Sequence, residues 1–206
     1  MIIRRLIFAA VIVLISLIGS VSAQQLRDRE LKPFPDPTTF QMPVEIVSIK
    51  LNGQEVAPRE KIKANDDWLK GLSFTVKNVS DKPIAYIAVG LHFEPRVDPP
   101  RVGAFFLTYG VDNSRGEHRR GNSPSAILPD RTVDLVLTRE RYPNFLEIVR
   151  QIGMPRSIDV VPYYVERVSF EDDPNVIWES GYIKLRNPGH SDRFDILEPY
   201  KLPSKH

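Results

Sequence analysis

Residues 72–93 read LSFTVKNVSDKPIAYIAVGLHF, and this stretch decides the fold class. Over 72–77 apolar side chains alternate with polar ones, which is the period of a strand with one buried and one solvated face. Residues 80–83, Ser-Asp-Lys-Pro, are typical of a turn. Over 84–93 one of the two faces is wholly apolar, so this second strand is expected to lie in the centre of a sheet.

Strand patterns continue on both sides of this stretch. On the N-terminal side, the β-rich run 44–51 ends at Asn52-Gly53, a strong hairpin signal because both residues tolerate positive φ. Residues 54–56 are the expected returning strand of that hairpin. On the C-terminal side, further strands are expected over 102–109, 132–137, 157–170 and 176–185.

One helix is predicted, over 142–152. Phe145, Val149 and Ile152 recur at helical spacing, Pro143 suits the first helical position, and Gly153 ends the helix. Because strands do not alternate with helices along the chain, the pattern argues against a parallel βαβ sheet. We predict a mainly β fold, an antiparallel two-sheet sandwich with one short helix before the last two strands.

Three short strings follow patterns that recur in a known family. Residues 72–84 fit the string apolar-x-V-x-N-x-S-x-K-P-I, and 128–133 are similar to an L-P-G-x-x-V strand entry, with Asp130 in place of the glycine. Residues 168–173, followed by Trp178 and Gly181, look like a terminal hairpin. Over roughly 44–185 the chain therefore resembles exported bacterial immunoglobulin-like domains. The resemblance implies an immunoglobulin-like sandwich that binds or spaces other molecules, and it implies no chemistry.

The first 23 residues have the order of a cleavable secretory signal peptide. Arg4 and Arg5 form a positive head, an apolar run extends over 6–18, and Val21-Ser22-Ala23 forms a small-residue cleavage site. The alternative is an uncleaved membrane anchor, but the apolar run is shorter than the roughly 20 residues that span a bilayer. We therefore expect export to the periplasm or the exterior, with no membrane span after cleavage.

The remaining chain is expected to divide into three parts. Residues 24–42 are polar and then proline-rich, and since each proline fixes φ and lacks an amide donor, we expect an extended tether. Residues 43–188 carry the strand and helix patterns and form the sandwich domain. Residues 189–206 form a polar C-terminal tail. Part of this tail could dock onto the domain through Phe194, Ile196 and Leu197.

Composition narrows the function classes. The chain has 28 basic and 26 acidic residues, and two of the basic ones lie within 1–23, so the processed chain is formally neutral. A neutral chain has no global attraction for nucleic acid or anionic membranes. The absence of Cys excludes thiol nucleophiles, thiolate zinc sites, iron–sulfur clusters and a lipid-anchored lipoprotein. Because small eukaryotic secreted domains often carry disulfides, it also favours a bacterial source.

Common catalytic signatures are missing from the sequence. It holds no G-x-S-x-G, H-E-x-x-H, P-loop or G-x-G-x-x-G motif, and we predict no catalytic residue, no metal and no cofactor. Glu171-Asp172-Asp173 with Asn175 offers oxygen ligands for calcium, but a tight hairpin turn explains these residues as well. His92 is expected to be a partly buried or surface histidine on the less apolar face of its strand, since a ligand or base would need a partner. Four aromatic residues are expected to pack the core or its rim rather than to form a ligand platform, with the two neighbouring tyrosines on opposite faces: Trp68, Trp178, Tyr163 and Tyr164.

The best candidate site is the loop 115–121, Arg-Gly-Glu-His-Arg-Arg-Gly. Arg115, His118, Arg119 and Arg120 could grip a phosphate, a carboxylate or an acidic partner, because arginine presents a planar two-pronged donor. The alternative is a flexible loop that its charge keeps solvated.

Three functions remain open on these grounds. The first is a non-enzymatic binding or scaffold module of the bacterial envelope or exterior, whose partner is another envelope or extracellular protein. The second is a structural assembly subunit that pairs through a sheet edge. The third is a hydrolase whose site is assembled from scattered residues. The oligomeric state is left open.

Overall fold

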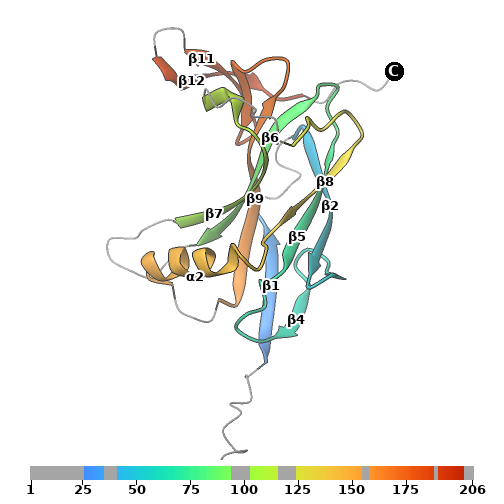
Figure 1. Ribbon diagram of the computed structural model, residues 1–206, viewed down its shortest axis with the longest axis vertical. Coiled ribbons are helices and arrows are strands. Elements are labelled where there is room, and N and C mark those ends of the chain that lie inside the picture. The colour runs from blue at the N-terminus through green and yellow to red at the C-terminus, as the bar shows by residue number, and fades with distance from the viewer. Residues whose placement is uncertain are drawn as a thin grey trace, which may run out of the picture.

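The chain folds mainly into β-strands. A computed structural model describes residues 26–34, 41–93, 103–115, 124–154, 158–187 and 190–201. The expected signal peptide lies outside these residues. Within them the chain forms two β-sheets, one α-helix and one short 3₁₀ helix, which confirms the predicted mainly β class (Figure 1). No described helix is both long and apolar enough to cross a membrane.

The larger sheet has eight strands and is organised around β9. Its order is β12-β11-β10-β9-β1-β4, with β6 pairing with β9 and β7 pairing with β6. The strand β9 pairs in parallel with β1 and antiparallel with β6 and β10. The strands are β1 (Arg27–Pro33), β4 (Lys61–Ala64), β6 (Ile84–Phe93), β7 (Gly103–Gly110), β9 (Val160–Phe170), β10 (Val176–Glu179), β11 (Tyr182–Asn187) and β12 (His190–Pro199).

The smaller sheet has four strands in the order β3-β2-β5-β8. They are β2 (Val44–Leu51), β3 (Gln54–Glu55), β5 (Leu72–Asn78) and β8 (Thr132–Val136). The predicted hairpin is confirmed, since Asn52 and Gly53 turn with φ of 51° and 83° between β2 and β3. Asp130, where the resembling strings have glycine, has a φ of 61°, the left-handed conformation that glycine adopts most readily.

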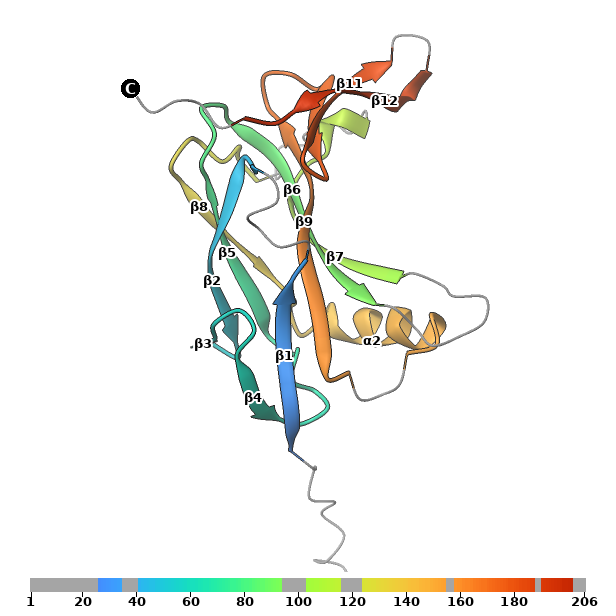
Figure 2. The same ribbon diagram turned by 180° about the vertical axis from the view of Figure 1, so that it is seen from behind.

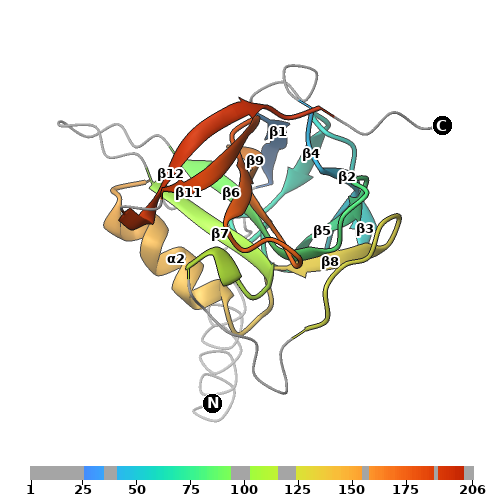
Figure 3. The same cartoon turned by 90° about the horizontal axis from the view of Figure 1, so that it is seen from above.

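The core lies between the two sheets, whose strands surround it when the molecule is seen along its long axis (Figure 3). Phe74 of β5, Ile87 of β6 and Leu135 of β8 are each at most 1% exposed. The ring of Phe74 lies 5.1 Å from that of Tyr163 on β9, so side chains of the two sheets meet. The apolar residues that alternate with polar ones in the sequence therefore form the buried face of each sheet.

The helix α2 (Tyr142–Gln151) lies where it is predicted. Phe145 and Val149 are buried, and the Phe145 ring contacts those of Phe93, Phe105 and Tyr142. This face anchors α2 beside β7 (Figure 1).

Among the described residues after α2 the chain forms four strands where two are predicted. The segment 176–185 is split because Ser180 and Gly181, with φ of 53° and 90°, make a two-residue turn between β10 and β11. Further on, β12 occupies part of the expected polar tail and pairs with β11 along its length. The tail is therefore in large part a strand of the larger sheet.

The expected tether also contains a strand. Over Arg27–Pro33, β1 pairs antiparallel with β4 and parallel with β9. Arg29 on this strand is fully buried: its guanidinium donates to the Ile158 carbonyl at 2.8 Å and pairs with the carboxylates of Asp159 and Asp66. Composition suggests a solvated segment here, but these long-range ion pairs fix it in the sheet.

Candidate functional site

The Arg-rich loop is only partly described. Arg115 is the last residue of the 3₁₀ helix η1 (Asn113–Arg115), and its side chain is 62% exposed. Its Nε lies 3.1 Å from the Asp112 carboxylate. His118, Arg119 and Arg120 lie outside the described residues, so anion or partner binding by this loop stays a prediction.

Arg115 belongs to a network of charges beneath the β11–β12 hairpin. Asp112, 3% exposed, accepts from the hydroxyl of Ser114 and lies 3.4 Å from a guanidinium nitrogen of Arg167. Arg167 on β9 also donates to Glu179 on β10 at 2.7 Å, and Lys184 on β11 pairs with the same carboxylate. The network ties four segments together and fixes the base of the hairpin.

Glu179 is the centre of this network. Burial by itself would raise the pKa of Glu179, but hydrogen bonds from Lys184 and Arg167 outweigh it and hold the pKa below the ordinary 4.5. A carboxyl whose folded pKa lies below its unfolded value stabilises the fold above the unfolded pKa. That contribution is lost as the pH falls below 4.5 towards the folded pKa.

We expect Glu179→Gln to make the free energy of unfolding depend less on pH in the acid range. The variant should be less stable than the parent protein at neutral pH by about 1–2 kcal/mol, since two cations lose their carboxylate. The difference should shrink as the pH falls below 4.5, as measured by urea unfolding at stepped pH.

Glu147 supplies the matched control. Hydrogen bonds from Arg150 and Gln151 lower the pKa of Glu147 to about 2. The ion pair between Glu147 and Arg150, however, lies on the solvated surface of α2. Salt should therefore remove the effect of Glu147→Gln and leave most of that of Glu179→Gln. Equal salt sensitivity would show that the network does not fix the hairpin.

The hairpin itself projects from the body of the molecule. We call β11 and β12 together the arm; it lies at the opposite end of the molecule from β4 (Figure 2). Leu185, Ile196 and Leu197 on the arm are 42%, 64% and 59% exposed. No described strand pairs with the outer edge of β12.

A second open edge belongs to β2. Along one side β2 pairs with β5 over its whole length, but on the other side β3 covers only Lys50 and Leu51. The pairing register shifts between Ile46 and Ser48, and Val47 between them is 43% exposed. Beside this edge lies a shallow depression, which we call the groove, lined by Ile46, Val47, Ser48, Ile49, Glu55, Val56, Ala57 and Pro58.

The aromatic residues and the histidine considered in the sequence belong to the core or pack against neighbouring rings. Trp68 and Trp178 are 3% and 2% exposed, which confirms the core interpretation. Tyr163 lies in the core, whereas Tyr164 faces the other side of β9, against the His92 ring. His92 lies between this ring and that of Phe34, each with a centroid 6.1 Å away.

The calcium candidate forms the turn between β9 and β10. The Asp173 carboxylate accepts from the backbone amide of Asn175 at 3.2 Å, which is an Asx turn. Within the described ranges, no three or more His, Asp and Glu side chains are arranged to hold a metal ion. The Asx turn accounts for Asp173 and Asn175.

Comparison with known protein families, curated proteins and solved structures finds no match to this chain.

Sequence reasoning missed both open edges for different reasons. The strand β12 lies where a polar tail is expected, although the alternation of Arg193, Phe194, Asp195 and Ile196 is typical of a strand and could have indicated it. Val47 gives no such signal, because whether a strand next to it is missing depends on the sheet order and not on the local sequence.

Proposed function

We propose that this chain is a non-enzymatic binding or scaffold module of the bacterial envelope or exterior, with an immunoglobulin-like sandwich as its frame. In this proposal it captures an extended segment of another envelope or extracellular protein along the open edge of β2. The signal-peptide pattern of residues 1–23 supports a place in the envelope or exterior. The sequence strings at 72–84 and 128–133 support the immunoglobulin-like sandwich.

The observation that carries the binding mode is the open edge of β2 beside the groove. Over 44–48 no described strand pairs with that edge, so its outward amides and carbonyls are available to an added strand. Natural edges are often blocked by lysine or proline, but within 44–49 the only charged residue is Glu45.

The groove supplies side-chain contacts in line with this edge. Its lining is mostly apolar, from Ile46, Val47 and Ile49 on β2 and from Val56 to Pro58 opposite. An added strand places every second side chain on one face, so an apolar side chain of the partner would enter the groove. The expected partner segment is therefore extended, with alternating apolar residues.

We expect Val47→Asp to abolish partner capture without unfolding the protein. The substitution places a charge at the mouth of an apolar groove, on a side chain that is already 43% exposed. Capture is measured by a photo-reactive amino acid at Glu45, used on native envelopes, with the crosslinked partner peptide identified by mass spectrometry.

Val136→Asp is the control for this experiment. Val136 is 39% exposed on β8, the opposite edge of the same sheet, so the change in charge and exposure is matched. It should leave the crosslink at Glu45 intact. Absence of any crosslink in the parent protein, or a crosslink that Val47→Asp leaves unchanged, would overturn the binding mode.

A further inference from the structure

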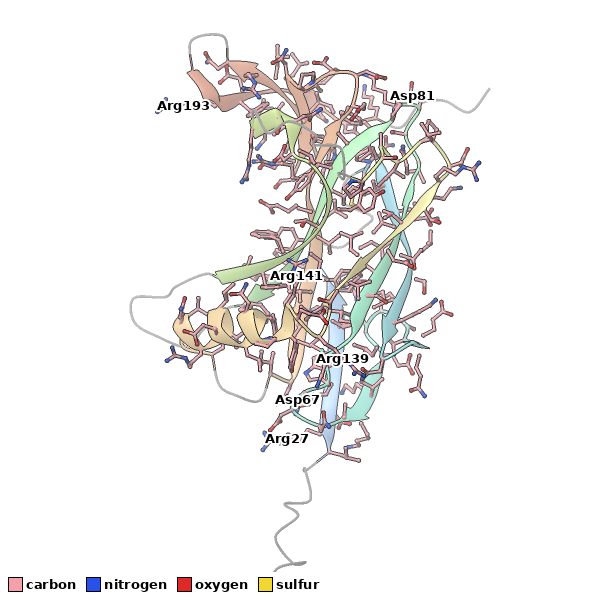
Figure 4. The ribbon with its side chains drawn as sticks, in the orientation of Figure 1. Arg27, Asp67, Asp81, Arg139, Arg141 and Arg193 are labelled. Carbon is pink, nitrogen blue, oxygen red and sulfur yellow. The ribbon has the colours of Figure 1, made fainter. Side chains whose placement is uncertain are left out.

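The edge of β12 differs from that of β2 in length and surroundings. It is the outermost strand of the larger sheet, ten residues long, and its far side has no strand partner among the described residues. A long unpaired edge is a template for strand pairing with another chain. Arg193 lies on the projecting arm, away from the rest of the sheet (Figure 4).

The arm has little core of its own. β10 supports only part of β11, from Tyr182 to Leu185, while β12 reaches beyond it. From Arg193 to Pro199 every side chain is exposed except that of Phe194, which lies beneath the guanidinium of Arg186. A two-stranded ribbon is marginally stable in water, and a third strand along β12 would stabilise it.

The sequence of β12 is complementary to itself in one register. When two copies of a strand pair antiparallel about a two-fold axis, the residue on the axis faces its own copy. An axis at Arg193 would oppose two arginines, and an axis at Asp195 would oppose two carboxylates, both of which are destabilising. An axis at Phe194 opposes two phenylalanines and places Arg193 of each copy against Asp195 of the other.

That register gives each favourable contact twice. Both Arg193 and Asp195 are exposed, and the Asp195 carboxylate accepts from the side-chain amide of Asn187 at 2.8 Å, which steadies it beside the edge. The facing phenylalanine rings add an aromatic cross-strand pair.

We propose that a second copy of this chain pairs with β12, antiparallel about a two-fold axis at Phe194, and joins the two larger sheets into one. The partner follows from the charge pattern, since this register places Arg193 of each copy against Asp195 of the other. The dimer uses a different edge from the groove, so it is independent of the proposed function, and Val47→Asp should leave it unchanged.

The test reverses the charges at Arg193 and Asp195, one at a time. Arg193→Glu places two carboxylates against each other across each cross-strand pair, and Asp195→Arg places two guanidinium groups there. Each variant should raise the dimer dissociation constant by roughly tenfold or more in sedimentation velocity over a concentration series, because two cross-strand pairs become repulsive. Far-UV circular dichroism checks that each variant is folded.

Mixing the two variants is the decisive measurement. In the mixed pair, the introduced glutamate of one variant faces the introduced arginine of the other, and the unchanged Asp195 faces the unchanged Arg193. A heterodimer should therefore form at concentrations where each variant alone is monomeric. The variant that carries both substitutions should likewise regain self-association. A parent protein that stays monomeric over the whole series, or a mixture that associates no better than its components, would overturn the proposal.

Discussion

Arg29→Ala should lower the free energy of unfolding by about 3 kcal/mol, and the melting temperature by roughly 10 °C. The side chain is fully buried and joins three separate segments: β1, which carries it, the Asp66 turn, and the Ile158–Asp159 segment that leads into β9. Truncation removes the hydrogen bonds and leaves a cavity. The loss should stay near the lower end of the range for broken buried ion pairs, because Asp66 and Asp159 are 57% and 54% exposed and regain water.

Lys63→Ala on the neighbouring strand is the control. Lys63 pairs with Asp28 of β1 at 2.9 Å, but both side chains are more than half exposed. Removing this pair should cost less than about 1 kcal/mol. Thermal unfolding of both variants, with hydrogen exchange at the β1 amides, separates the two cases. Similar losses in the two variants would show that Arg29 does not anchor β1.

The contrast between β5 and β1 shows what the sequence can predict about this fold. In β5, Phe74 and Val76 alternate with polar residues, and both are fully buried, so local pattern and tertiary position agree. In β1 the buried residues are Arg29 and Leu31, and Arg29 is stabilised by Asp159, 130 residues away in sequence. Pairing over that distance has no local signature, so a charged segment beside prolines predicts a solvated tether.

The candidate sites also differ in whether the local sequence can reveal them. Composition directs attention to Arg115 and its loop, because clustered charge is visible in sequence. The open edges of β2 and β12 depend on sheet order, and sheet order is set by which strands meet across the whole chain. The alternation around Phe194 is typical of a strand, but only the sheet order shows that this strand is an edge. A binding site that consists of an unpaired backbone therefore needs the fold before it can be located.

Gly110→Ala is expected to be more damaging than the same change at Gly90 or Gly103, at about 4 kcal/mol. Its φ of +83° costs a residue with a Cβ about 1 kcal/mol. The added Cβ would stand 1.9 Å from the Ala85 carbonyl oxygen, and this is backbone that cannot rotate away. Ala85 is 1% exposed on β6, and its carbonyl accepts from the amide of Val111, so the end of the β6–β7 ladder must move, at about 3 kcal/mol.

Gly53→Ala isolates the steric part of that loss. Gly53 has the same φ of +83°, but no atom lies within 4 Å of the position that its Cβ would take. The free energy of unfolding of this variant should therefore fall by only roughly 1 kcal/mol, the cost of the left-handed conformation for alanine. Urea unfolding of the two variants measures the difference, which we assign to the contact between Gly110 and Ala85. If both variants lost the same amount, the strand end at Gly110 would be free to shift, and the rigid packing of β7 on β6 inferred from this contact would be wrong.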